Sequence, residues 1–128
     1  MIGLILGTSE GKNILSGLNE FTEDIFVSTA TAYGAELLKD YKYKILNEKP
    51  LNLSSLIEVI KKYDIKVFID ASHPYALEIT KNVMESCKCC GIQYIRYERP
   101  KVAEEFKENR NVIMVEQLIS CIKYILMY

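Results

Sequence analysis

The sequence lacks an excess of charge of either sign. Its 128 residues include 16 lysines and arginines against 17 aspartates and glutamates, which gives a formal net charge of −1. A chain without a basic field has no general attraction for nucleic acid or for an anionic membrane surface. We therefore expect neither of these as a partner.

Long hydrophobic runs are also missing. No apolar stretch approaches the roughly 18 residues that are needed to cross a bilayer. The start, Met1–Gly7, is apolar but has neither a basic n-region nor a small-residue cleavage site. It is therefore expected to be a buried strand instead of a signal peptide, and these absences together favour a cytoplasmic protein.

Paired metal ligands are scarce. The chain has one histidine, and its four cysteines are Cys87, Cys89, Cys90 and the remote Cys121. Zinc sites usually combine two paired ligand groups, and no second group is present here. Cys87 and Cys90 fall on the apolar face of a predicted helix, where a free thiol packs as a small hydrophobic group. We expect buried thiols and no metal, with a Cys-rich interaction protein as the weaker alternative.

Apolar runs alternate with helical patterns along most of the chain. Short apolar runs predict buried strands at residues 2–6, 25–28, 43–46, 66–70 and 93–97. Apolar residues three and four positions apart predict helices at residues 14–18, 53–60 and 76–90. Asn52 is a plausible N-cap, and Gly91 a plausible helix-ending residue. The order predicts a Rossmann-like α/β domain of three layers with a mainly parallel sheet.

One compositional break divides the chain. Residues 1–100 fit one Rossmann-like domain, whereas residues 101–111 form a charged linker. Beyond it we expect a strand at 112–115 and a helix, so that residues 101–128 would be the linker and the start of a truncated second domain. The apolar end, Ile125–Tyr128, suggests that a following segment is missing or that a partner covers it.

A glycine-rich turn follows the first strand. Gly7-Thr8-Ser9-Glu10-Gly11 would offer backbone N–H groups and a helix dipole to a phosphate. Its glycine spacing matches neither the dinucleotide fingerprint nor the P-loop. Nucleotide binding and a tight turn that merely needs glycine for its backbone both remain open.

Two hydroxyl residues end the second strand. Folds specific for NAD place an acidic residue there to hold the ribose 2′-OH, and this chain has Ser28 and Thr29 instead. Without a carboxylate to repel a 2′-phosphate, NADP(H) is favoured if a dinucleotide binds. The alternative is that these hydroxyls cap a loop.

The third candidate site is Ile69–Ala76, between a strand and a helix. It holds His73, whose ring can transfer protons near neutral pH, although a lone histidine is more often structural. Asp70 is placed to orient that ring or to cap the next helix. Tyr75 is placed to stack on a planar ligand or simply to pack.

The fourth candidate site is Arg96-Tyr97-Glu98-Arg99-Pro100. Arginines at the carboxyl end of a strand can clamp carboxylates at two points. The alternative is a surface ion pair with Glu98, which contributes little stability.

Together these stretches resemble the precorrin-6A reductase family, also called precorrin-6x reductase, of cobalamin (corrin ring) biosynthesis. The resemblance rests on the glycine turn at Gly7, on Asp70-Ala71-Ser72-His73-Pro74-Tyr75-Ala76 and on the Arg96–Pro100 stretch, in this order. It implies hydride transfer from NADPH to precorrin-6A or its cobalt form, which are tetrapyrroles. It implies an enzyme of two similar α/β domains with the active cleft between them, of which this chain would be the NADPH-binding first half.

The resemblance also assigns roles to single residues. It implies that the dinucleotide is bound by Gly7, Thr8, Ser9, Glu10, Ser28, Thr29 and Ser72. It implies that the substrate side of the cleft is formed by His73, Pro74, Tyr75, Arg96 and Arg99. We expect His73, the candidate catalytic residue, to position substrate rather than to donate a proton. A non-catalytic NADP(H)-binding module, or one subunit of a split assembly that needs a C-terminal domain or partner chain, is the alternative.

Overall fold

A single parallel sheet organises the chain. The computed structural model describes residues 1–7, 9–30, 34, 36–97 and 112–115. Within these, six strands lie in the order β3-β2-β1-β4-β5-β6, and every adjacent pair is parallel. The strands are β1 (Ile2–Leu6), β2 (Ile25–Ser28), β3 (Ile45–Asn47), β4 (Val67–Ala71), β5 (Gln93–Tyr97) and β6 (Val112–Val115). The predicted Rossmann-like α/β fold is confirmed, and the strand predicted at residues 43–46 lies slightly later, as β3.

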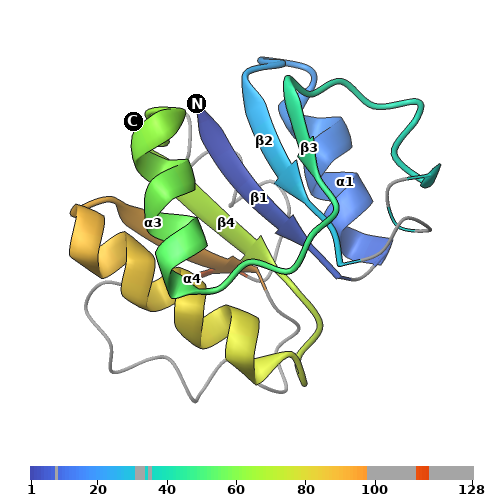
Figure 1. The fold of residues 1–128 in the computed structure, drawn as a ribbon. Coiled ribbons are helices and arrows are strands. Elements are labelled where there is room, and N and C mark those ends of the chain that lie inside the picture. Colours follow the sequence, from blue (N-terminus) through green and yellow to red (C-terminus); the bar gives the residue numbers. More distant parts are fainter. Residues whose placement is uncertain (8, 31–33, 35, 98–111, 116–128) are drawn as a thin grey trace.

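Helices cover both faces of this sheet (Figure 1). One face carries α1 (Ser9–Leu18), and the other carries α3 (Leu53–Lys62) and α4 (Leu77–Cys90), which pack side by side. Alternate residues of β1 point to opposite faces, as in any strand. Leu4 and Leu6 pack in the core beneath α1, whereas Ile5 packs in the core beneath α3 and α4.

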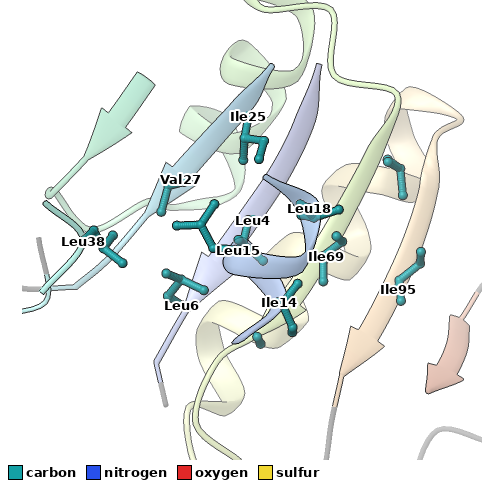
Figure 2. Close-up of a cluster of buried hydrophobic side chains, with 12 residues drawn as sticks. Leu4, Leu6, Ile14, Leu15, Leu18, Ile25, Val27, Leu38, Ile69 and Ile95 are labelled. Carbon is teal, nitrogen blue, oxygen red and sulfur yellow. The ribbon is translucent and has the colours of Figure 1, made fainter. Parts of the chain in front are cut away.

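The two cores explain why the helices form where they do. Beneath α1, its apolar side chains Ile14, Leu15 and Leu18 are buried against β1 and its neighbours (Figure 2). The opposite core buries side chains of α3 and α4 against the sheet, among them Cys87. Burial of these apolar surfaces is the main driving force for the three-layer arrangement.

Helix ends follow the predicted chemistry. The side chain of Asn52 accepts a hydrogen bond from the Ser55 backbone N–H at 2.8 Å, which caps the start of α3. Gly91 adopts the left-handed conformation with φ 67° where α4 ends. Cys87 is buried and the partly buried Cys90 packs against the same core, as predicted, whereas Cys89 is exposed.

The strand predicted at residues 112–115 is confirmed as β6. It pairs in parallel with β5, so it extends the same sheet. The predicted domain boundary near residue 100 and the predicted helix after β6 lie outside the described residues and stay predictions. In the described part of the chain, no helix is long and apolar enough to span a membrane.

Candidate functional site

A cleft of about 700 Å³ lies at the carboxyl ends of β1, β2 and β4. This edge of a parallel sheet is where open α/β folds bind ligands. Side chains and backbone from three predicted site stretches line it: Gly7, Ser28, Thr29, Ser72, His73 and Tyr75. The structure therefore brings together residues that lie far apart in the sequence.

Gly7, which lines the cleft, permits the turn after β1 to approach the backbone of the turn after β4. A Cβ atom at this position would lie 2.7 Å from the backbone nitrogen of His73 and 3.0 Å from Cα of Ser72. Neither atom belongs to a flexible side chain, so any larger residue would force the two turns apart. Gly11 has a related role, because its Cβ would lie 2.5 Å from a methyl carbon of Leu6. The glycines thus fit the turn tightly against its neighbours.

The helix α1 starts directly beyond this turn, at Ser9. Its N-terminus follows the end of β1, as phosphate-binding turns require. Thr8 and the side chains of Ser9 and Glu10 lie outside the described residues, so their predicted contacts stay predictions.

Asp70 is the centre of a buried polar network at the end of β4. Its carboxylate is fully buried and accepts hydrogen bonds from the Tyr94 hydroxyl at 2.7 Å and from the Ser72 backbone N–H at 3.0 Å. Nη1 of Arg96 forms an ion pair with the same carboxylate at 3.0 Å. Burial and the negative charge of Asp70 raise the pKa of Tyr94 well above its ordinary value, so the phenol stays protonated and donates.

This network corrects two predictions. Asp70 was expected to orient the ring of His73 or to cap α4, but its hydrogen bonds go to other residues and α4 has no side-chain cap. Arg96 was expected to clamp substrate carboxylates, yet its side chain is only 1% exposed. Because Asp70 and Arg96 are opposite each other in the β4–β5 register, their side chains extend from the same face of the sheet, and their charges meet in the protein interior instead. Arg96 is too buried for a surface ion pair, but the predicted partner Glu98 lies outside the described residues, so an ion pair between Glu98 and an arginine stays a prediction.

Ser72 connects the network to the cleft. Its hydroxyl accepts a hydrogen bond from Nη1 of Arg96 at 2.9 Å and lies 3.1 Å from the hydroxyl of Thr80 on α4. Ser72 is 5% exposed and still lines the cleft. Arg96 therefore shapes the cleft wall by holding Ser72 in place. The other predicted arginine, Arg99, lies outside the described residues.

His73 is exposed at the cleft. Its Nδ1 accepts a hydrogen bond from the Tyr75 backbone N–H at 3.1 Å. A nitrogen that accepts carries no proton, so the geometry assigns the proton of the neutral ring to Nε2. The ring therefore offers an N–H donor on the side away from this turn, which suits it for contact with a ligand acceptor.

Tyr75 extends the site at its rim. The side chain is 86% exposed, and its ring centroid lies 5.2 Å from that of His73. Leu77 beside it is 63% exposed. A packed core role for Tyr75 is excluded by this exposure. Pro74, the other predicted substrate residue, is half-buried and does not line the cleft.

The end of β2 forms the other side of the cleft. Ser28 and Thr29 are each 6% exposed and line it. Asn47 at the end of β3 holds both residues. Its side-chain amide donates to the Ser28 hydroxyl at 3.0 Å, and its backbone carbonyl accepts from the Thr29 backbone N–H at 2.9 Å. Loop capping and cleft lining thus occur at the same residues.

The loop between β3 and α3 forms a further wall of the cleft, which the motifs in the sequence did not predict. Residues 49–52, which begin with Lys49 and end with the cap Asn52, line the cleft. The N-cap at Asn52 was a usable indication, because a loop that joins a parallel strand to a helix opens at the same sheet edge as the other strand ends.

Known proteins match both the sequence and the fold. The family described as "Precorrin-6x reductase CbiJ/CobK" matches residues 1–128. A cobalt-precorrin-6A reductase of Methanocaldococcus jannaschii is 37% identical over 88% of this chain and 44% of its own length. The enzyme of the same name from Methanococcus maripaludis is 33% identical over 79% of this chain and 40% of its own length. The chain therefore spans less than half the length of these curated relatives.

A solved structure titled "CobK precorrin-6A reductase" shares the fold with a TM-score of 0.64. It is 19% identical to this chain, and the match covers 77% of this chain and 37% of that one. With the family match across all 128 residues, the chain belongs to the precorrin-6x reductase family.

Proposed function

We propose that this member of the precorrin-6x reductase family binds NADPH and is the nucleotide-binding half of a reductase that acts on precorrin-6A or cobalt-precorrin-6A in cobalamin biosynthesis. One observation carries the proposal: the cleft joins the glycine turn after β1, the hydroxyls after β2 and the Ser72–His73 turn after β4. Its relatives are named as cobalt-precorrin-6A reductases. The cytoplasmic location expected from the sequence belongs to the same proposal.

The residues that line the cleft fit NADP(H), a dinucleotide with a 2′-phosphate. A cleft of about 700 Å³ falls within the usual range for cofactor sites. Gly7 and the start of α1 would hold the pyrophosphate, and Ser28 and Thr29 would contact the adenosine ribose, with no carboxylate at the end of β2 to repel a 2′-phosphate. When bound, NADPH supplies the hydride for the reduction.

The chain's own residues would act on the substrate side. Nε2–H of His73 would donate to an acceptor on the tetrapyrrole, and the exposed ring of Tyr75 would stack on its planar surface. Ser72 would stay fixed by Arg96 while the ligand binds beside it. In this proposal His73 positions the substrate, because Asp70 is committed to other partners and no described group relays a proton to the ring.

The second candidate function is an NADP(H)-binding module or subunit without catalysis of its own. The match covers 44% and 40% of the two reductases above, so more than half of each has no counterpart in these 128 residues. The resemblance implies that family members form the active cleft between two α/β domains. A single α/β domain would form only one wall of that cleft.

Titration of the purified 128-residue chain with NADPH and with NADH tests the cofactor. NADPH fluorescence should rise on binding, and NADPH should bind more tightly than NADH. Absence of binding by both nucleotides, or equal binding of both, would contradict the proposal. Turnover of cobalt-precorrin-6A by the same sample then separates the two candidates, because the module predicts nucleotide binding with no consumption of NADPH.

A further inference from the structure

Lys49 is a cation in the cleft with no role assigned so far. It is exposed and lines the cleft beside Ser28 and Thr29. Among the described residues that line this cleft, it is the one lysine or arginine. The carboxylate in the same set is Glu78, which belongs to α4 on the side of the Ser72–His73 turn.

The backbone around Lys49 is fixed at the end of β3. The amide side chain of Asn47 donates to the carbonyl oxygen of Lys49 at 2.6 Å and also to the hydroxyl of Ser28 at 3.0 Å. Asn47 is paired with Ser28 in the β2–β3 register. One amide group therefore ties the loop that bears Lys49 to the end of β2, where the adenosine ribose is expected.

The charge of Lys49 is uncommitted. Lysines 39, 42, 44 and 66 each pair with a carboxylate, whereas no ion pair of Lys49 occurs in the described part of the chain. The helix α3 begins shortly after Lys49, at Leu53, and its first turn contains no acidic residue. Its positive N-terminal dipole adds to the field of the lysine.

We propose that Lys49 binds the 2′-phosphate of NADP(H) and so sets the preference for this cofactor over NAD(H). The inference rests on the proposed function, and it supplies the cation that the sequence lacks at the end of β2, where Ser28 and Thr29 stand. An ammonium group on a flexible stem binds a phosphate as a point charge. Selectivity then arises from one loop that is held to the end of β2 by Asn47.

The test uses two probes that differ only in the phosphate, 2′,5′-ADP and 5′-AMP, measured by calorimetric titration of the full chain. Lys49→Met should weaken 2′,5′-ADP about tenfold, equivalent to about 1.4 kcal/mol, and leave 5′-AMP nearly unchanged. Lys49→Arg keeps the charge and should retain most of the affinity. Lys61→Met is the matched control, because Lys61 is exposed in the last turn of α3 and does not line the cleft.

The outcomes separate this inference from the proposed function. If the unmodified chain prefers 2′,5′-ADP and Lys49→Met keeps that preference, Lys49 is not the phosphate-binding residue, although the cofactor assignment stands. If the unmodified chain binds neither NADPH nor 2′,5′-ADP, the cofactor assignment fails and the inference fails with it. Equal losses of affinity for 2′,5′-ADP and 5′-AMP in Lys49→Met would also overturn it. Loss of a contact to the 2′-phosphate cannot weaken the binding of 5′-AMP, because 5′-AMP has no 2′-phosphate.

Discussion

Breaking the ion pair between Asp70 and Arg96 should destabilise the protein more than any other substitution that we predict here. Their side chains are 0% and 1% exposed and meet at 3.0 Å. Removal of one partner of a buried pair leaves an uncompensated charge, which typically costs about 3–5 kcal/mol. We therefore expect Asp70→Asn and Arg96→Met each to lower the free energy of unfolding by about that amount.

The double variant distinguishes pairing from two separate losses. In Asp70→Asn with Arg96→Met neither charge of the pair is left buried, so the double variant should cost less than the sum of the two single variants. Residues in direct contact show such coupling, of about 0.5–3 kcal/mol. Tyr94→Phe should cost less, about 1.5–3 kcal/mol, because it removes one hydrogen bond to a charged acceptor and leaves the ion pair intact.

Urea unfolding followed by circular dichroism measures these free energies. Lys42→Met is the matched control, because Lys42 pairs with Glu23 at a similar distance of 3.2 Å but both side chains are largely exposed. Exposed pairs contribute about 0–1 kcal/mol. Single-variant losses at Asp70 and Arg96 no larger than the control, or strictly additive losses in the double variant, would refute the reasoning.

Two further predictions concern one thiol and two glycines. Burial raises the pKa of Cys87 to about 12. Just above pH 9 the thiol therefore loses its proton only in the unfolded chain. The free energy of unfolding should fall there by up to about 1.4 kcal/mol per pH unit. Urea melts should show a shallower decline for Cys87→Ala. Gly7→Ala should weaken NADPH binding in titrations, because the new Cβ meets the backbone of His73. Gly91→Ala has open space around its Cβ but must adopt φ 67°, so it should lower the free energy of unfolding by about 1–2 kcal/mol and leave binding unchanged.

Local patterns predicted much of the fold. The apolar run of β1 and the helical spacing on α3 depend on residues close in sequence, and so do the cap at Asn52 and the left-handed Gly91. Each of these is decided by a few neighbouring side chains and the backbone between them. The boundary of β3 was less accurate, because a three-residue edge strand has little pattern of its own.

The role of Arg96 could not be predicted in the same way. Whether a strand residue faces a ligand or the interior depends on the register between strands, and Asp70 and Arg96 are paired across β4 and β5, 26 positions apart. A shift of one residue would turn Arg96 to the opposite face of the sheet. The motif therefore predicted that this arginine belongs to the site, whereas its burial follows only from the pairing.

Gly7 shows why the reason for a glycine in a turn cannot be predicted from the sequence alone. The sequence left open a phosphate-binding turn, in which glycine leaves room for a ligand, and a tight turn that merely needs glycine for its backbone. In the structure its missing Cβ leaves room for the backbone of Ser72 and His73, which follow β4. Ser72 is in turn held by Asp70 and Arg96. The turn after β1 and the turn after β4 are thus packed against each other, so a substitution at Gly7 should also displace the backbone of His73.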